Sequence, residues 1–136
     1  MIRSIVKDPL FLGQKARKAG KDDIVIGRDL LDTLLAHQAT CVGMAANMIG
    51  EAVAVIAVDT GQMKMVMFNP VIVKRSGPYE TNEGCLSLPG IRKVQRYQTI
   101  TVKFQDMCLQ EETAVFSGKA AEIIQHECDH LAGILI

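Results

Sequence analysis

The segment QHECDHLAG near the C-terminus constrains this chain more than any other feature. On an α-helix, at about 100° per residue, His126 and His130 lie about 40° apart on one face, so both imidazoles can bind one metal ion. Glu127 projects from the flank of that face, where a carboxylate that is not a ligand can accept a proton from water activated at the ion. Cys128 points to the opposite side of the helix and cannot share the ion. The segment therefore predicts a metal-dependent hydrolytic site carried by a helix.

A helix of about four turns is expected between Ser117, a good N-cap residue, and Gly133, a good C-cap residue. Ile123, Ile124 and Leu131 adjoin the two histidines on this helix, which places the metal at the edge of the buried side. The alternative is that histidines at this spacing are ordinary surface or core residues. Since the chain has only 3 histidines and two of them form the motif, the metal site is favoured.

Length and charge narrow the class of protein. With 136 residues the chain is expected to form a single domain over residues 1–136. Its 15 basic and 15 acidic residues balance, which argues against a broad surface for nucleic acid or anionic membrane. The N-terminus lacks the apolar core of a signal peptide, and no stretch approaches the length of a membrane span. We therefore expect a cytoplasmic protein with neither nucleic acid nor membrane as a partner.

The cysteines indicate free thiols rather than disulfides. None of the 4 is paired in a CxxC pattern, and the chain shows no export signal. A thiolate is therefore available as a third metal ligand. The cysteines are Cys41, Cys85, Cys108 and Cys128.

The hydrophobic pattern predicts two helices and several strands. Residues 1–26 read as an irregular arm that lies mostly on the surface. Leucines recur at helical spacing over residues 28–38, which predicts an amphipathic helix with His37 as a bystander near its end. Strands are expected at residues 52–59, 65–75, 97–106 and 114–116.

Prolines and glycines punctuate the strand region. Pro70 suggests an edge position or a bulge inside its strand, and Ser76, Gly77 and Pro78 predict a break after it. Residues 81–90 then read as a loop or an irregular strand. Elements in this order favour an α+β domain with antiparallel pairing, in which the motif helix packs on the sheets.

Three blocks considered together resemble a known family. CVGMAANMIG, EGCLSLPG and QHECDHLAG occur in the order and at the separations of the three motifs of the peptide deformylases. The N-terminal segment with Asp8 and Pro9 is also similar, so the resemblance covers nearly the whole chain. It implies an α+β fold in which antiparallel sheets surround the C-terminal helix that carries HExxH. It also implies a metal-dependent hydrolase that removes the formyl group from the N-terminal formylmethionine of nascent polypeptides.

The resemblance also implies a set of site residues. The family prefers Fe²⁺, although Zn²⁺, Ni²⁺ or Co²⁺ can occupy the site of purified protein. The implied partners are N-formylmethionyl peptides, with at most weak association with the ribosome because the chain stops soon after the motif helix. The implied residues are Cys85, His126 and His130 as metal ligands, Glu127 as the acid and base, the backbone N–H of Leu86 as an oxyanion donor, and Gly43, Glu83 and Arg96 around the substrate cleft.

The first block departs from the family at two positions. The family pattern G-x-G-x-A-A-x-Q has glycine where this chain has Cys41, and glutamine where it has Met48. The family's glutamine amide hydrogen-bonds the developing oxyanion, which methionine cannot do. Loss of such a donor costs roughly 100- to 1000-fold in turnover. Asn47 is adjacent, but neighbouring side chains usually diverge; Cys41 either packs or serves as a redox-sensitive thiol.

Two other functions compete with an active deformylase. The first is a homologue that binds metal and formylated peptide without efficient turnover, which the loss of the glutamine motivates. The second is a zincin-like protease, which is disfavoured because Cys85 in EGCLS is not that family's third ligand. Without that context, Cys85 could equally be a small buried hydrophobic residue.

Overall fold

One antiparallel sheet curls around a central helix. The computed structural model describes residues 1–135. The sheet has 5 strands in the order β1-β2-β3-β4-β5, so strands adjacent in sequence pair in space. The strands are β1 (Gly43–Ala45), β2 (Val55–Asp59), β3 (Lys64–Gly84), β4 (Ile91–Gln105) and β5 (Glu111–Ser117). The helices are α1 (Pro9–Leu12), α2 (Ile24–Ala36) and α3 (Gly118–Leu131), with 3-10 turns η1 (Lys21–Asp23) and η2 (Ala46–Ile49).

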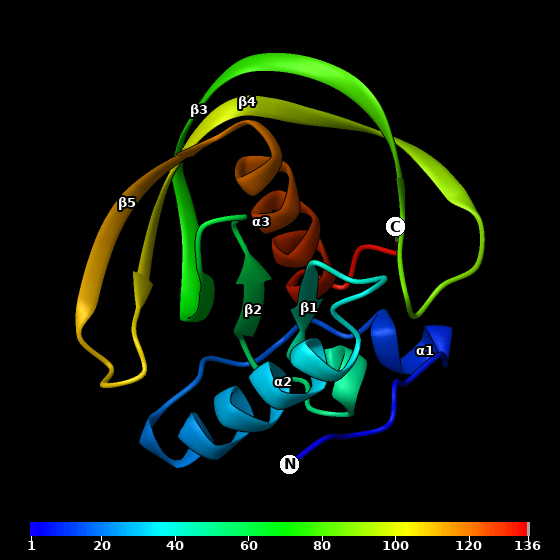
Figure 1. The fold of residues 1–136 in the computed structure, drawn as a ribbon, viewed down its shortest axis with the longest axis vertical. Coiled ribbons are helices and arrows are strands. Elements are labelled where there is room, and N and C mark those ends of the chain that lie inside the picture. The colour runs from blue at the N-terminus through cyan, green and yellow to red at the C-terminus, as the bar shows by residue number, and fades with distance from the viewer. Residues whose placement is uncertain (136) are drawn as a thin grey trace.

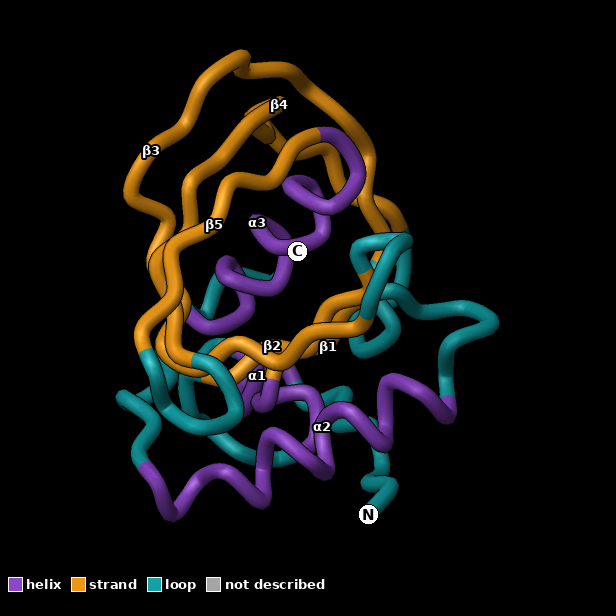
Figure 2. The backbone as a smooth tube through the Cα atoms, turned by 60° about the vertical axis from the view of Figure 1, so that its left-hand side comes forward, coloured by secondary structure: helices purple, strands orange, loops and turns teal. Residues whose placement is uncertain are grey.

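Helix α3 lies inside the curve of the sheet, as both views of the backbone show (Figure 1, Figure 2). Ile124 of α3 is fully buried, and Ile100, Val102 and Phe104 of β4 turn inward as their alternation predicts. Each such buried side chain contributes about 1.5–3 kcal/mol to folding. The expected α+β architecture is therefore confirmed, with a single strongly curved sheet surrounding the motif helix.

The expected helix of the motif is confirmed closely. Ser117 is the N-cap residue of α3, and the helix ends with Ala132 as its C-cap, one residue before Gly133. Gly133 has φ +78°, the left-handed conformation that glycine adopts without strain. Among residues 1–135, no helix is long and apolar enough to cross a membrane.

Strand β3 is much longer than the expected strand at residues 65–75. The predicted break at 76–78 is wrong, because Pro78 pairs with Tyr97 in the register of β3 and β4. β2 pairs only with residues 64–68 of β3, so the rest of β3 has β4 on one side and a free edge on the other. A proline without an N–H is tolerated at such an edge. The bulge expected at Pro70 is confirmed by a register shift between Phe68 and Val71.

The extra length of β3 matters for the site. The sequence predicts a loop or an irregular strand at residues 81–90. Residues 81–84 continue β3, and residues 85–90 form the connection to β4. β4 and β5 are likewise longer than expected. Because β3 ends at Gly84, it places the next residue, Cys85, at the edge of the space that faces α3.

The N-terminal arm is more buried than expected. It is irregular apart from α1, whose N-cap Asp8 accepts a hydrogen bond from the N–H of Leu10. The prediction of a mostly surface-lying arm is wrong for Leu12, which is fully buried, and for Ala19, which is 5% exposed. An isolated β-bridge also joins Arg17 to Val53, which lies just before β2. The charged residues of the arm conceal these buried positions in the sequence.

Candidate metal centre

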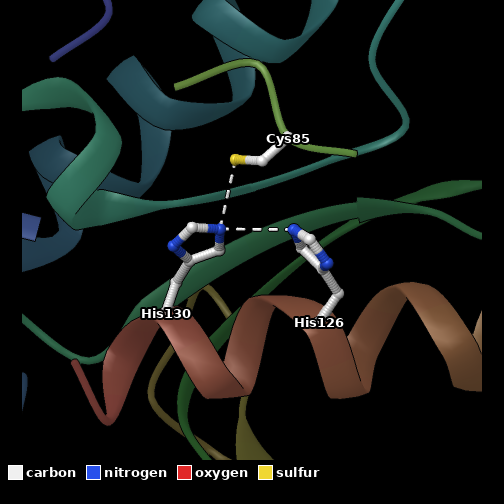
Figure 3. Close-up of side chains that lie close together, drawn as sticks. All are labelled: Cys85, His126 and His130. Atoms are coloured by element: carbon white, nitrogen blue, oxygen red, sulfur yellow. Dashed lines mark hydrogen bonds between the residues drawn. The ribbon is translucent and has the colours of Figure 1, made fainter. Parts of the chain in front are cut away.

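The three expected ligands meet at one point. The Sγ atom of Cys85 lies 3.2 Å from Nε2 of His130, and the Nε2 atoms of His130 and His126 are 3.2 Å apart (Figure 3). All three donor atoms lie within 4.8 Å of one another. Both histidines come from α3 and the cysteine from the segment after β3, so only the folded sheet brings the three together.

This donor set has the dimensions of a metal site. Ligands at normal bond lengths around a tetrahedral ion are separated by about 3.3 Å between two nitrogens and about 3.6 Å between nitrogen and sulfur. The observed 3.2 Å separations are close to these values. Three protein donors leave one tetrahedral position open, which is typical of catalytic rather than structural sites. The residues therefore fit a catalytic metal ion.

A buried carboxylate orients the first histidine. Nδ1 of His126 donates a hydrogen bond to Glu83 Oε1 at 2.7 Å, which fixes the ring with Nε2 directed at the other two ligands. Arg96 donates two hydrogen bonds to the same carboxylate, at 2.7 and 2.9 Å, and a third to Asp129 at 2.7 Å. Breaking a buried pair of this kind costs about 3–5 kcal/mol. Glu83 and Arg96 thus hold the His126 ring in place.

The electrostatics favour a thiolate. Burial raises the pKa of the Cys85 thiol, but hydrogen bonds from His126 and His130 outweigh burial and lower it to about 5. For Glu83, burial likewise raises the pKa, and hydrogen bonds from His126 and Arg96 lower it to about 2. Both groups are therefore anionic at neutral pH. A thiolate is the form of cysteine that binds metals.

Glu127 lies beside the three donors without joining them. It is 4% exposed, and its Oε1 atom has no hydrogen-bond partner among residues 1–135. Burial raises the pKa of Glu127 to about 7, which suits a group that must both accept and release a proton near neutral pH. A Cβ atom on Gly43 would come within 2.8 Å of Glu127 Oε2 and 2.7 Å of Ile123 Cγ2. Only glycine at position 43 leaves room for this carboxylate.

A pocket opens next to the metal centre. Its volume is about 200 Å³, and it lies between β1, the end of β3 and one face of α3. Leu86, Gly43 and Glu83 line it together with Glu127, whereas Arg96 lies behind Glu83 and is not in its wall. The lining residues are Thr40, Cys41, Val42, Gly43, Met48, Asn82, Glu83, Gly84, Cys85, Leu86, Lys119, Glu122, Ile123, His126 and Glu127.

Met48 lies in the pocket wall and has no side-chain hydrogen-bond donor. It is 1% exposed, and its thioether sulfur accepts the N–H of Ala45 at 3.4 Å. Asn47 does not replace the missing amide, because its Nδ2 atom donates to the backbone carbonyls of His130 at 3.0 Å and Leu12 at 3.4 Å. The side chain of Asn47 thus fastens the end of α3 and lies outside the pocket wall.

Cys41 lies in the same wall as Met48. Its thiol donates a hydrogen bond to the carbonyl of Gly43 at 2.9 Å. Burial raises its pKa to about 11, so it is a thiol rather than a reactive thiolate at neutral pH. These features support packing over the redox alternative.

The remaining candidates lie away from the metal centre. The ring of His37, at the end of α2, hydrogen-bonds through Nδ1 with the carbonyl of Thr33 at 2.9 Å. Cys128 lies on the other side of α3 from the ligands, and burial raises its pKa to about 12. Both residues stand apart from the group formed by the three ligands, as expected.

Sequence reasoning missed two polar residues of the motif helix. Asp129 accepts the third hydrogen bond of Arg96, and Gln125 both accepts from and donates to the backbone of Tyr97 on β4, at 2.9 Å each. Both residues stand within the motif, but their partners lie on a strand that the helix meets only after folding. No spacing in the sequence indicates those partners.

Known proteins are similar to this chain in sequence and in fold. The model of the polypeptide deformylase family matches residues 2–136. A peptide deformylase from Clostridium beijerinckii is 52% identical over 136 residues, which is 100% of each chain. The similarity therefore extends over the segments that carry the candidate metal ligands, the glycine-containing block and the N-terminal arm.

Solved structures resemble the whole fold. The peptide deformylase from Thermus thermophilus is 36% identical and has a TM-score of 0.88, covering 99% of this chain and 84% of its own. A class I type b peptide deformylase from Acinetobacter baumannii, solved with Met-Ala-Ser bound, is 29% identical with a TM-score of 0.88 and covers 99% of this chain and 97% of its own.

Proposed function

This chain belongs to the peptide deformylase family, and we propose that Cys85, His126 and His130 bind its metal ion while Glu127 transfers the proton. Its activity is that of the family, a metal-dependent hydrolysis that removes the formyl group from N-terminal formylmethionine and releases formate. The observation that carries the assignment of roles is the convergence of one thiol and two imidazoles beside a buried carboxylate in a pocket. The ring of each ligand histidine presents Nε2 to this point.

The donor atoms indicate which ions suit the site. Imidazole and thiolate donors bind Fe²⁺, Co²⁺, Ni²⁺ and Zn²⁺, and we propose Fe²⁺ as the working ion. When bound, the ion supplies Lewis acidity that activates water and polarises the formyl carbonyl. The protein's contribution is to fix the donors, with Glu83 holding the His126 ring in the tautomer that leaves Nε2 free.

Glu127 is assigned the role of proton carrier. Its pKa of about 7 allows the carboxylate to accept a proton from the attacking water and then donate it to the departing amine nitrogen. The products are formate and a free N-terminus. The backbone N–H of Leu86, next to Cys85 in the pocket wall, is assigned to the developing oxyanion.

The pocket is assigned to the first residue of the formylated peptide. The bound Met-Ala-Ser in the Acinetobacter baumannii relative supports a peptide site in this fold. Gly43 and Glu83 stand in the pocket wall, and Arg96 supports Glu83 from behind. Because formylated N-termini belong to nascent chains, we also propose action in the cytoplasm, with weak contact with the ribosome.

A second candidate is a homologue that binds metal and formylated peptide with little turnover. Met48 is the observation that favours it, since a thioether in the pocket wall cannot donate to an oxyanion. The two candidates share the metal site and differ only in rate. A protease is disfavoured because the third donor is a thiolate at the end of a strand.

The test is formate release from a formyl-Met peptide by protein loaded anaerobically with Fe²⁺. Deformylation above the level of the Glu127→Ala variant is expected, with no cleavage of the corresponding unformylated peptide. If formate release equals that of the variant while metal content is the same, the chain is not an active deformylase and the homologue with little turnover is favoured. Cleavage of the unformylated peptide would instead indicate a protease.

A further inference from the structure

A charged pair stands in the wall of the pocket at the end away from the metal. The pocket-lining residues of α3 are spaced as one helix face, running from Glu127 and His126 back through Ile123 to Glu122 and Lys119. The first two form the reactive end. The last two are joined by an ion pair, with Lys119 Nζ 3.5 Å from Glu122 Oε1.

The distance along the helix from His126 to Glu122 is close to the length of a substrate side chain. At 1.5 Å per residue, Glu122 lies about 6 Å and Lys119 about 10 Å along the axis from His126. A formyl group held at the metal end leaves the first side chain of the peptide free to extend along this face. A methionine side chain is roughly 5 Å long, so its end comes near the level of Glu122, and the ion pair holds Lys119 Nζ beside that residue, 3.5 Å from Glu122 Oε1.

The ammonium group of Lys119 can donate further hydrogen bonds. The ammonium group has three donors, and its ion pair with Glu122 is long at 3.5 Å. The side chain of Lys119 is 75% exposed and that of Glu122 is 15% exposed, so the lysine can change rotamer while the glutamate stays in the wall. A polar atom at the tip of a substrate side chain would therefore meet a mobile cationic donor.

Resting on the proposed function, we propose that Lys119 makes this pocket accept a polar first side chain, so that its substrates include N-formyl peptides beginning with methionine sulfoxide. The sulfoxide has the length of methionine and carries an oxygen that accepts hydrogen bonds. In a wholly apolar pocket that oxygen would lose its hydrogen bond to water without replacement. Lys119 Nζ supplies the replacement, while the methylene groups of the substrate side chain pack on Ile123.

The test compares two formyl peptides that differ only in the first side chain, which is methionine sulfoxide in one and norleucine, the apolar isostere of methionine, in the other. The ratio of their kcat/KM values is measured for the wild type and for Lys119→Leu. The matched control is Lys93→Leu, because the Lys93 side chain is 72% exposed, pairs with Glu80 at 2.8 Å and lies outside this pocket. In Lys119→Leu the ratio of sulfoxide to norleucine should fall about three- to tenfold. This is the loss expected for one charge-assisted hydrogen bond that is weakened by exposure to solvent. Lys93→Leu should keep the wild-type ratio.

A second variant separates recognition from a merely structural ion pair. Glu122→Gln removes the competing carboxylate charge but keeps the size of the side chain, so the sulfoxide preference should persist or rise. If the ion pair served only to stabilise α3, both Lys119→Leu and Glu122→Gln would lower the rates with the two peptides alike. An unchanged ratio in Lys119→Leu overturns the proposal.

A binding measurement keeps this proposal separate from the proposed function. The affinities of the same two formyl peptides are measured by calorimetry on Glu127→Gln protein, with and without Lys119→Leu. Absence of formate release by the wild type on formyl-Met peptide would contradict the proposed function alone. The proposal then stands or falls on whether Lys119→Leu selectively weakens binding of the sulfoxide peptide.

Discussion

Replacing Met48 by glutamine should accelerate deformylation strongly. Met48 lies in the pocket wall, 1% exposed, and its sulfur only accepts the N–H of Ala45 at 3.4 Å. Glutamine has a side chain of similar length, but its terminal amide can donate to the developing oxyanion. A donor of this type is worth about 100- to 1000-fold in turnover, or about 3–4 kcal/mol. The gain should appear in kcat rather than in KM, because the oxyanion forms only in the transition state.

The same substitution should cost stability. The glutamine amide would lie where a thioether now packs, and a buried amide without full hydrogen bonding destabilises the folded state by about 1–3 kcal/mol. Met48→Gln should therefore be faster but less stable than the wild type. Opposite signs for rate and stability distinguish an added donor from a general improvement in packing.

The assay is formate release from a formyl-Met peptide by anaerobically loaded protein, together with metal content and thermal unfolding. Met48→Leu is the matched control, since it keeps an apolar side chain of similar size without a donor and should leave kcat within about threefold of the wild type. Unchanged kcat in Met48→Gln, with full metal content and an intact fold, would refute the argument that the pocket lacks an oxyanion donor at this position.

Three further predictions concern the support of the site and the fold. Glu83→Gln should weaken metal binding about 10- to 100-fold in chelator competition, because the carboxylate orients a ligand histidine; unchanged affinity would contradict this role. Gly43→Ala should lower kcat on the order of 100-fold at full metal content, since the new Cβ would lie 2.8 Å from Glu127 Oε2; wild-type kinetics would show that the carboxylate has other room. Arg17 holds the pKa of the Asp23 carboxyl below its usual range, so this carboxylate stabilises the fold above the unfolded pKa of about 4, and the contribution is lost as pH falls through the folded value. The difference in unfolding free energy between the wild type and Asp23→Asn should therefore be constant between about pH 5 and pH 7 and should shrink at lower pH. A difference that grows towards acid pH would contradict the assigned pair.

The placement of the two histidines could be predicted because it is local. Two histidines four residues apart on a helix must share a face, and the N-cap and C-cap residues fixed the extent of that helix in advance. Cys85 could be predicted as the third donor only through the family's motif. Nothing in the spacing shows that a residue 41 positions before His126 lies beside it in space. The pairing of β3 with β4 in the folded sheet brings Cys85 close to the histidines of α3.

The sheet was harder to predict because strand length depends on partners. Gly77 and Pro78 break a strand in isolation, yet β3 continues through them because it needs only β4 on one side there. The burial of Leu12 in the N-terminal arm likewise depends on a tertiary contact, with its backbone carbonyl receiving a hydrogen bond from Asn47. The side chains behind the ligands, including Arg96, were assigned to the cleft by resemblance, whereas their hydrogen bonds show how they act on it.

Cobalt substitution tests most directly whether the three residues bind one ion. Protein loaded with Co²⁺ should bind one equivalent and show the charge-transfer absorption of a thiolate bound to cobalt. The band should persist in Cys41→Ser, which alters the other thiol of the pocket wall, and disappear in Cys85→Ser. A band that survives in Cys85→Ser, or one that depends on Cys41, would contradict the assignment of Cys85, His126 and His130 as the metal centre.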